Sequence, residues 1–158
     1  MSIEIRAIGK GYLLRARQRF PRSRQVVFPF FADALNLETI TPDSLHFKVR
    51  TSCPIVMQEG QRINYRLRLH GLPFNWQSEI TAWEPNVRFI DEQRRGPYRY
   101  WINEHRFLDD DHGTLMIDEV RYGLFGGILL NRPFVAPNLR AIFAFRAAKL
   151  TEIFPAAG

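Results

Sequence analysis

The sequence is poor in the residues that build cross-links and metal centres. Only one of its 158 residues, Cys53, is a cysteine, so an internal disulfide is excluded. The four histidines stand far apart and match none of the spacings by which histidine and cysteine bind zinc; they are His46, His70, His105 and His112. We therefore predict no structural metal, and no motif indicates a cofactor.

Long apolar runs are also absent. No stretch approaches the roughly 18 apolar residues of a membrane-spanning helix, and residues 1–14 lack the charged-then-apolar pattern of a secretion signal. A cytoplasmic location is expected. Apolar residues nevertheless make up 46% of the chain and include thirteen phenylalanines, which must be buried. The length fits one domain over residues 1–158.

Lysine is scarce, and most of the positive charge comes from arginine. Only three of the 22 basic side chains are lysines, and the formal net charge is +6. This balance is compatible with nucleic acid, anionic lipid or an acidic partner. The arginines are spread along the chain without a recognition helix or a stacking motif, so nucleic-acid binding is not expected. A transient contact with an anionic membrane stays open as an alternative to simple solvation of the faces that carry Arg15, Arg17, Arg19, Arg66 and Arg68.

The hydrophobic pattern predicts an α+β fold. Residues 12–20 alternate as a half-solvated strand, and two short helices follow over residues 25–28 and 33–41. Six more strands are predicted between short, turn-rich connections, over 45–50, 61–70, 74–83, 87–93, 98–107 and 114–122. Apolar residues at helical spacing then predict a long helix from Asn138 to Phe154. We therefore predict a curved seven-stranded antiparallel sheet wrapped around the C-terminal helix.

Several motifs along nearly the whole chain resemble those of START-like (SRPBCC) proteins, a group related to polyketide cyclases and coenzyme Q-binding proteins. They are FFADALNL at 30–37, Thr41-Pro42, residues 76–80, FIDEQ at 89–93, RGPY at 95–98, Trp101, HRF at 105–107, Asp118 and Tyr122. The resemblance implies a helix-grip fold and the binding or carriage of a hydrophobic small molecule. A histidine is frequent in this group two residues before the position of His105, where this chain has Asn103. Chemistry that needs two histidines on that strand is therefore not expected.

Strand alternation predicts which side chains face the interior. The inward set is Val87, Phe89, Asp91, Gln93, Trp101, Asn103, His105, Phe107, Thr114, Met116, Asp118, Val120 and Tyr122. The opposite side exposes Arg88, Glu92, Glu104, Arg106, Glu119 and Arg121. A turn centred near Gly96 would set Asp91 opposite Trp101. A turn within 109–113 would set Asn103 near Asp118, with His105 one step along the strand.

Two inward carboxylates need a partner, because an unpaired buried charge is costly. Arg146, on the apolar stripe of the predicted helix, is the candidate. The cluster of Asp91, Asn103, Asp118 and Arg146 is either a structural network that joins helix and sheet or the polar end of a ligand pocket. Under the second interpretation, the ligand-binding residues are Tyr65, Trp76, Phe89, Asp91, Gln93, Trp101, Asn103, His105, Met116, Asp118, Tyr122 and Arg146.

The primary hypothesis is therefore a binder or carrier of a small hydrophobic molecule, such as a lipid, a quinone or a polyketide-like aromatic. The alternative is an enzyme of cyclase, dehydratase or hydrolase type with His105 as general acid or base, oriented by Asp91 or Asp118. No nucleophile motif supports catalysis. The glycine-rich segment 123–130 lacks the Gly-Lys-Ser/Thr ending of a phosphate loop, so nucleotide binding is rejected. It is a loop over the edge of the core, or a lid or membrane-touching entry. The oligomeric state stays open.

Overall fold

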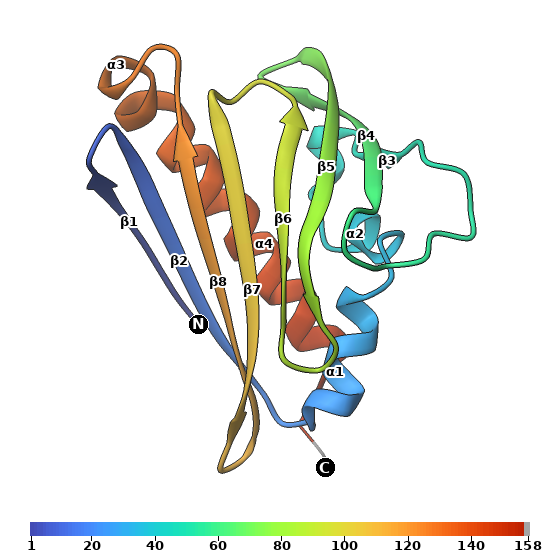
Figure 1. The fold of residues 1–158 in the computed structure, drawn as a ribbon. Helices are drawn as coiled ribbons and strands as arrows, with labels where there is room; N and C mark the ends of the chain where they lie inside the picture. The colour runs from blue at the N-terminus through green and yellow to red at the C-terminus, as the bar shows by residue number, and fades with distance from the viewer. Residues whose placement is uncertain (157–158) are drawn as a thin grey trace.

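The computed structural model describes residues 1–156 and contains one sheet with a long helix across one face (Figure 1). The strands are β1 (Ser2–Ile8), β2 (Gly11–Phe20), β3 (Lys48–Val49), β4 (Arg62–Leu69), β5 (Leu72–Glu84), β6 (Arg88–Arg95), β7 (Tyr100–Asp110) and β8 (Gly113–Gly123). They lie in the order β1-β2-β8-β7-β6-β5-β4-β3, and every neighbouring pair is antiparallel. The helix is α4 (Ala136–Ile153). The predicted helix-grip architecture is confirmed.

The sheet has eight strands rather than the predicted seven. The prediction missed β1, which forms a hairpin with β2 through Gly9, a glycine with a positive φ of 51°. This edge strand is mostly solvated, and only Ile3 and Ile5 pack against the core, which left a weak alternation signal. The strand predicted over 45–50 shrinks to Lys48–Val49, because the chain before it forms the short helix η1 (Asp43–Leu45).

The two helices between β2 and β3 differ from their predicted bounds. Helix α1 (Arg24–Phe31) continues through Pro29, since burial of Val27, Phe28 and Phe31 holds its last turn against the sheet despite the lost backbone hydrogen bond. Helix α2 (Asn36–Thr39) is a single turn rather than residues 33–41. Asp33 lies before it and accepts a hydrogen bond of 2.9 Å from the backbone N–H of Leu35.

The chain becomes helical earlier than predicted after the last strand. A short turn of helix, α3 (Ile128–Leu130), leads through the π-helical turn η2 (Asn131–Val135) into α4. Asn138 therefore lies inside the helix and does not cap it. Of the segment 123–130, predicted to be a loop, only residues 124–127 are loop, because Gly123 ends β8 and Ile128 begins α3.

The core lies between the inner face of the sheet and α4. One cluster of buried side chains is built on Phe28, Ile80 and Phe107, and a second on Tyr122 and Phe143. The alternation predicted for β6, β7 and β8 places the expected side chains inward. Within residues 1–156, no helix is long and apolar enough to cross a membrane.

Two residues depart from the predicted division into inward-facing and exposed side chains. Val87 precedes β6 and is exposed rather than inward. Glu119 lies on the outer face of β8 but is only 8% exposed, because the arginine side chains of Arg15 and Arg106 cover it. An outer position therefore does not by itself imply solvent contact.

Candidate ligand-binding cavity

The strand register brings a histidine between two aspartates. On β6 and β7, Phe89 pairs with His105, while on β7 and β8, His105 pairs with Asp118. The predicted pairing of Asp91 with Trp101 was wrong, since Asp91 pairs with Asn103; Asn103 in turn pairs with Val120, two residues from Asp118 on the same face. Both turns are centred one residue later, and the β7–β8 turn consists of residues 111 and 112, between the paired Asp110 and Gly113. A turn displaced by one residue shifts the pairing by two, so every side chain keeps its predicted face and changes its partner.

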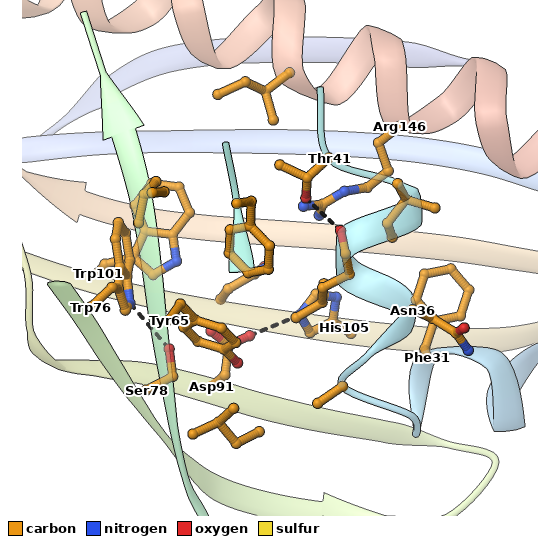
Figure 2. A pocket seen from close by; sticks show the side chains of 18 of the residues that line it. Phe31, Asn36, Thr41, Tyr65, Trp76, Ser78, Asp91, Trp101, His105 and Arg146 are labelled. Atoms are coloured by element: carbon orange, nitrogen blue, oxygen red, sulfur yellow. Dashed lines mark hydrogen bonds and ion pairs between the residues drawn. The ribbon is translucent and has the colours of Figure 1, made fainter. Parts of the chain in front are cut away.

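His105 is hydrogen-bonded through both ring nitrogens. Nδ1 lies 2.6 Å from Asp118 Oδ1. Nε2 lies 2.9 Å from Asp91 Oδ2, a contact that Figure 2 marks. Burial by itself lowers the pKa of His105, but the charges and hydrogen bonds of the two aspartates outweigh it and hold the pKa at about 9. The ring is therefore an imidazolium at neutral pH, and it donates one N–H to each carboxylate.

Arg146 reaches the same region from α4 (Figure 2). Its guanidinium lies over the ring of Phe143, with 4.9 Å from Cζ to the ring centroid. Burial lowers the pKa of Arg146, and the charges of Asp118 and Asp91 partly offset this effect. We expected Arg146 to hold one of the carboxylates directly, but no ion pair joins them within residues 1–156; His105 holds both. Nε of Arg146 is buried and has no hydrogen-bond partner among these residues.

A cavity of about 160 Å³ adjoins this cluster. Its walls come from α1 and α2, the strands β4 to β7 and helix α4, and most of them are apolar. Polar side chains of its lining include Asp91, Asn103, His105 and Arg146 beside the cluster, and Asp33, Asn36, Thr41 and Ser78 elsewhere. Asn103 is 5% exposed, and its Oδ1 has no hydrogen-bond partner among residues 1–156. The interior therefore combines an apolar chamber with a polar wall whose hydrogen-bonding capacity is incompletely used.

Eight of the twelve predicted ligand-binding residues line this cavity: Tyr65, Trp76, Phe89, Asp91, Trp101, Asn103, His105 and Arg146. The other four do not. Gln93 closes the β6–β7 turn through hydrogen bonds with the backbone of Tyr98, at 2.8 and 3.2 Å. Tyr122 donates its hydroxyl to Asn131 Oδ1 at 2.8 Å, and burial raises its pKa to about 12. Met116 and Asp118 instead line a separate small void beneath α4.

Sequence reasoning missed the wall that α1 and α2 provide. Phe31, Ala34 and Ile40 close the cavity from this side, as do Phe47 and Met57 in the irregular segments around β3. Figure 2 shows Phe31 and Thr41 on this wall, facing Tyr65 and Trp76 on the strands. The apolar stretch 30–37 is the sequence signal that could have located it, since it is too apolar for a surface connection.

The arrangement defines what the polar wall can do chemically. Both nitrogens of His105 are occupied by carboxylates, so the ring has no lone pair free to accept a proton. Of the two aspartates bonded to His105, Asp91, whose side chain is 20% exposed, is the one that lines the cavity. No group of three histidine, cysteine or acidic side chains in the described part of the chain could hold a metal ion.

No protein-family model and no curated protein matches the chain, but solved structures do. Protein CV1439 from Chromobacterium violaceum is 12% identical, with a TM-score of 0.71 over 92% of this chain and 99% of that one. Protein Ms6760 from Mycobacterium smegmatis is 15% identical, with a TM-score of 0.68 over 97% and 96%. Ginseng major latex-like protein 151 from Panax ginseng is 10% identical, with a TM-score of 0.70 over 93% and 99%. The chain therefore has the helix-grip fold that its sequence motifs implied.

Proposed function

We propose that this protein binds a small hydrophobic molecule in the internal cavity. The observation that carries the proposal is the chamber of about 160 Å³, whose walls are mainly aromatic and aliphatic and whose polar groups gather around Asp91 and His105. A few oriented polar groups in an apolar enclosure are typical of small-molecule sites. The fold shared with the ginseng and bacterial proteins is consistent with this function.

The volume favours one ligand class over others. An apolar cavity of about 150 Å³ admits benzene, so a chamber of this size suits a molecule of about one ring. A diacyl lipid or a long-tailed quinone would require the α1–α2 wall to move outward. Among the hydrophobic ligands considered from the sequence, a compact aromatic or polyketide-like ring fits this structure best.

The polar wall supports a ligand with a hydroxyl or carbonyl group. Among residues 1–156, Asn103 Oδ1 is an acceptor without a donor, and Arg146 Nε–H is a donor without an acceptor. A buried polar atom without a partner costs roughly 1–3 kcal/mol, so a ligand that completes one of these hydrogen bonds gains affinity over an apolar molecule of equal size. A phenol or a cyclic ketone has the required chemistry.

The test compares phenol with toluene, two probes of similar size that differ in one hydroxyl. We expect both to bind and to raise the melting temperature, because a ligand of the native state stabilises it by mass action. We expect phenol to bind about tenfold more tightly, as one additional hydrogen bond allows. Heteronuclear NMR titration would locate the perturbed amides around Asn103 and Arg146. The absence of binding by either probe would contradict the proposal.

Two variants of α4 distinguish binding of the probe in the cavity from its non-specific adsorption to the protein. Ile142 lines the cavity, and Ile142→Trp should fill part of it and abolish probe binding. Lys149 lies seven residues later on the same helix and is equally half-buried, but it does not line the cavity, so Lys149→Trp is the matched control. Equal loss of binding in both variants would indicate a non-specific effect. Native mass spectrometry after solvent extraction would then identify the natural ligand.

A second candidate function, proton transfer, rests on the chain of hydrogen bonds from Asp118 through His105 to Asp91. It ends at the carboxylate that lines the cavity, which makes Asp91 the better general base and His105 its positioning residue. Exchange of the α-protons of 1-indanone in D₂O would test it. Exchange that is accelerated by the native protein and lost in Asp91→Asn would support catalysis, and equal rates with and without protein would oppose it.

A further inference from the structure

The segment that joins β8 to α4 exposes an unusual group of large apolar side chains. We call it the apolar tip: Phe125, Ile128, Leu129, Leu130 and Phe134, which are 81%, 68%, 80%, 45% and 54% exposed. Five such residues within ten positions are more than the scattered exposed side chains of an ordinary surface. Solvent contact is unfavourable for them, so the tip is suited to an apolar partner.

The apolar tip lies at one end of the sheet, together with three hairpin turns. The strand pairs Ile8–Gly11, Tyr12–Tyr122 and Tyr100–Gly123 place the β1–β2 turn, the end of β8 and the β6–β7 turn side by side. The rings of His70 and Phe134, 6.3 Å apart, join the β4–β5 turn to the same group. Figure 1 shows α3 at this end, beside the turn between β1 and β2.

Charge is distributed unequally between the two ends of the sheet. The segments that form the end bearing the tip carry no acidic residue over 8–12, 68–73, 94–100 and 122–135. They expose basic residues instead, among them Lys10, Arg95, Arg99 and Arg132. The opposite end carries Asp109, Asp110 and Asp111 in the β7–β8 hairpin and Glu84 before the β5–β6 turn. A surface that approaches the tip therefore meets cationic side chains without competing carboxylates.

We propose that this end docks on an anionic phospholipid membrane, with the apolar tip inserted at the boundary between headgroups and acyl chains. Apolar residues surrounded by lysine and arginine are the signature of proteins that lie on a bilayer surface, and each nearby basic residue adds attraction to anionic lipid. The tip is a projecting group of side chains rather than a groove, which suits insertion into lipid. The docking surface stands independently of ligand binding in the cavity.

Co-sedimentation with vesicles tests the apolar part of the proposal. The purified full chain should bind vesicles of equal parts phosphatidylcholine and phosphatidylglycerol at least tenfold more tightly than phosphatidylcholine alone. The double substitution Phe125→Ser and Leu129→Ser should weaken binding at least tenfold, because it removes two inserted side chains. The matched control is Val87→Ser with Leu108→Ser, two exposed apolar residues at the opposite end, which should leave binding unchanged.

A second pair of variants tests the basic surround. Lys10→Gln, Arg95→Gln and Arg132→Gln together should weaken binding at least tenfold. The control triple Arg17→Gln, Arg50→Gln and Arg66→Gln changes the net charge equally at exposed positions elsewhere and should retain most of the binding. All these positions are exposed, so unfolding transitions should match the native protein.

Three outcomes would overturn the proposal. The first is equal binding to both vesicle compositions, and the second is equal loss in the tip and control variants. The third is a concentration-dependent dimer in gel filtration that disappears in the Phe125→Ser and Leu129→Ser variant while vesicles bind neither protein. That result would assign the tip to a second copy of the chain.

Discussion

The two faces of strands β7 and β8 carry similar charged side chains in different surroundings. On the inner face, His105 bonds to Asp91 and Asp118 inside the core. On the outer face, Glu119 bonds to Arg15 at 2.6 Å and to Arg106 at 3.1 Å, and both arginines are about one-third exposed. Asp118 and Glu119 are adjacent in sequence, so alternation alone decides which carboxylate lies beside the cavity.

The difference in surroundings determines how much each ion pair stabilises the fold. In the outer pairs Glu119 is covered, but its arginine partners are about one-third exposed, so water and salt reach the pairs and each contributes less to stability. Inner pairs replace lost hydration, and removal of one member leaves a charge buried without compensation. We therefore expect the inner cluster to determine both the stability of the core and the ligand chemistry of the cavity, while the outer network mainly maintains solubility.

The largest expected effect follows from breaking the inner pair. Asp118→Asn should lower the free energy of unfolding by about 3 kcal/mol, because His105 loses its shorter carboxylate contact in a buried site. Glu119→Gln, the matched change one residue later on the outer face, should cost about 1 kcal/mol. Urea denaturation of both variants at neutral pH measures the difference. Equal losses would show that the two faces are energetically equivalent and would contradict the comparison.

The inner cluster should also make stability depend on pH. The folded pKa of His105, about 9, lies above the unfolded value of about 6.5. The corresponding stabilisation is therefore fully present below about pH 6.5 and is lost as the pH rises through about 9, a change of about 3 kcal/mol. Denaturation at a series of pH values and NMR titration of the His105 ring test this. A flat profile over that range would indicate a neutral ring.

The sequence predicted which face of the sheet each side chain occupies better than it predicted which residues pair between neighbouring strands. Alternation placed Asp91, His105 and Asp118 inward because period two needs only local information. Their register depends on the residue at which each turn is centred, and a displacement of one residue separated Asn103 from Asp118 and brought His105 there instead. The strand pattern predicted the antiparallel sheet and the C-terminal helix, and the resemblance to START-like proteins identified their arrangement as a helix grip.

Sequence reasoning missed several parts of the site for the same physical reason. The wall from α1 and α2 is made by short segments whose contacts are set by packing against the sheet, which no local period reports. Gln93 and Tyr122 face inward as predicted, but Gln93 bonds to the Tyr98 backbone and Tyr122 to Asn131. These pairings depend on the exact centre of the β6–β7 turn, which was predicted one residue too early, and on the helical turn η2, which was not predicted.

A smaller effect should follow the loss of Arg146. Its guanidinium is desolvated and its Nε is unpaired, so Arg146→Met exchanges a costly charge for an apolar chain of similar length. The free energy of unfolding should change by less than about 1 kcal/mol, while phenol should lose its advantage over toluene. A loss of stability as large as that of Asp118→Asn would instead make Arg146 a structural member of the cluster.

The smallest effect is expected at an outer ion pair whose carboxylates are more exposed than that of Glu119. Arg88 lies between Glu84 and Glu104, 2.7 and 3.3 Å from their carboxylates, and these carboxylates raise its pKa. Water and salt already solvate all three groups, so Arg88→Gln should barely shift the midpoint of urea unfolding at low salt. At about 1 M salt, where screening extends over roughly 3 Å, the shift should vanish. Asp118→Asn should keep its effect under the same conditions, because its pair with His105 is buried away from ions. If salt abolished the shift of the urea midpoint in both variants, the inner and outer ion pairs would be equally accessible to ions, which would contradict the comparison.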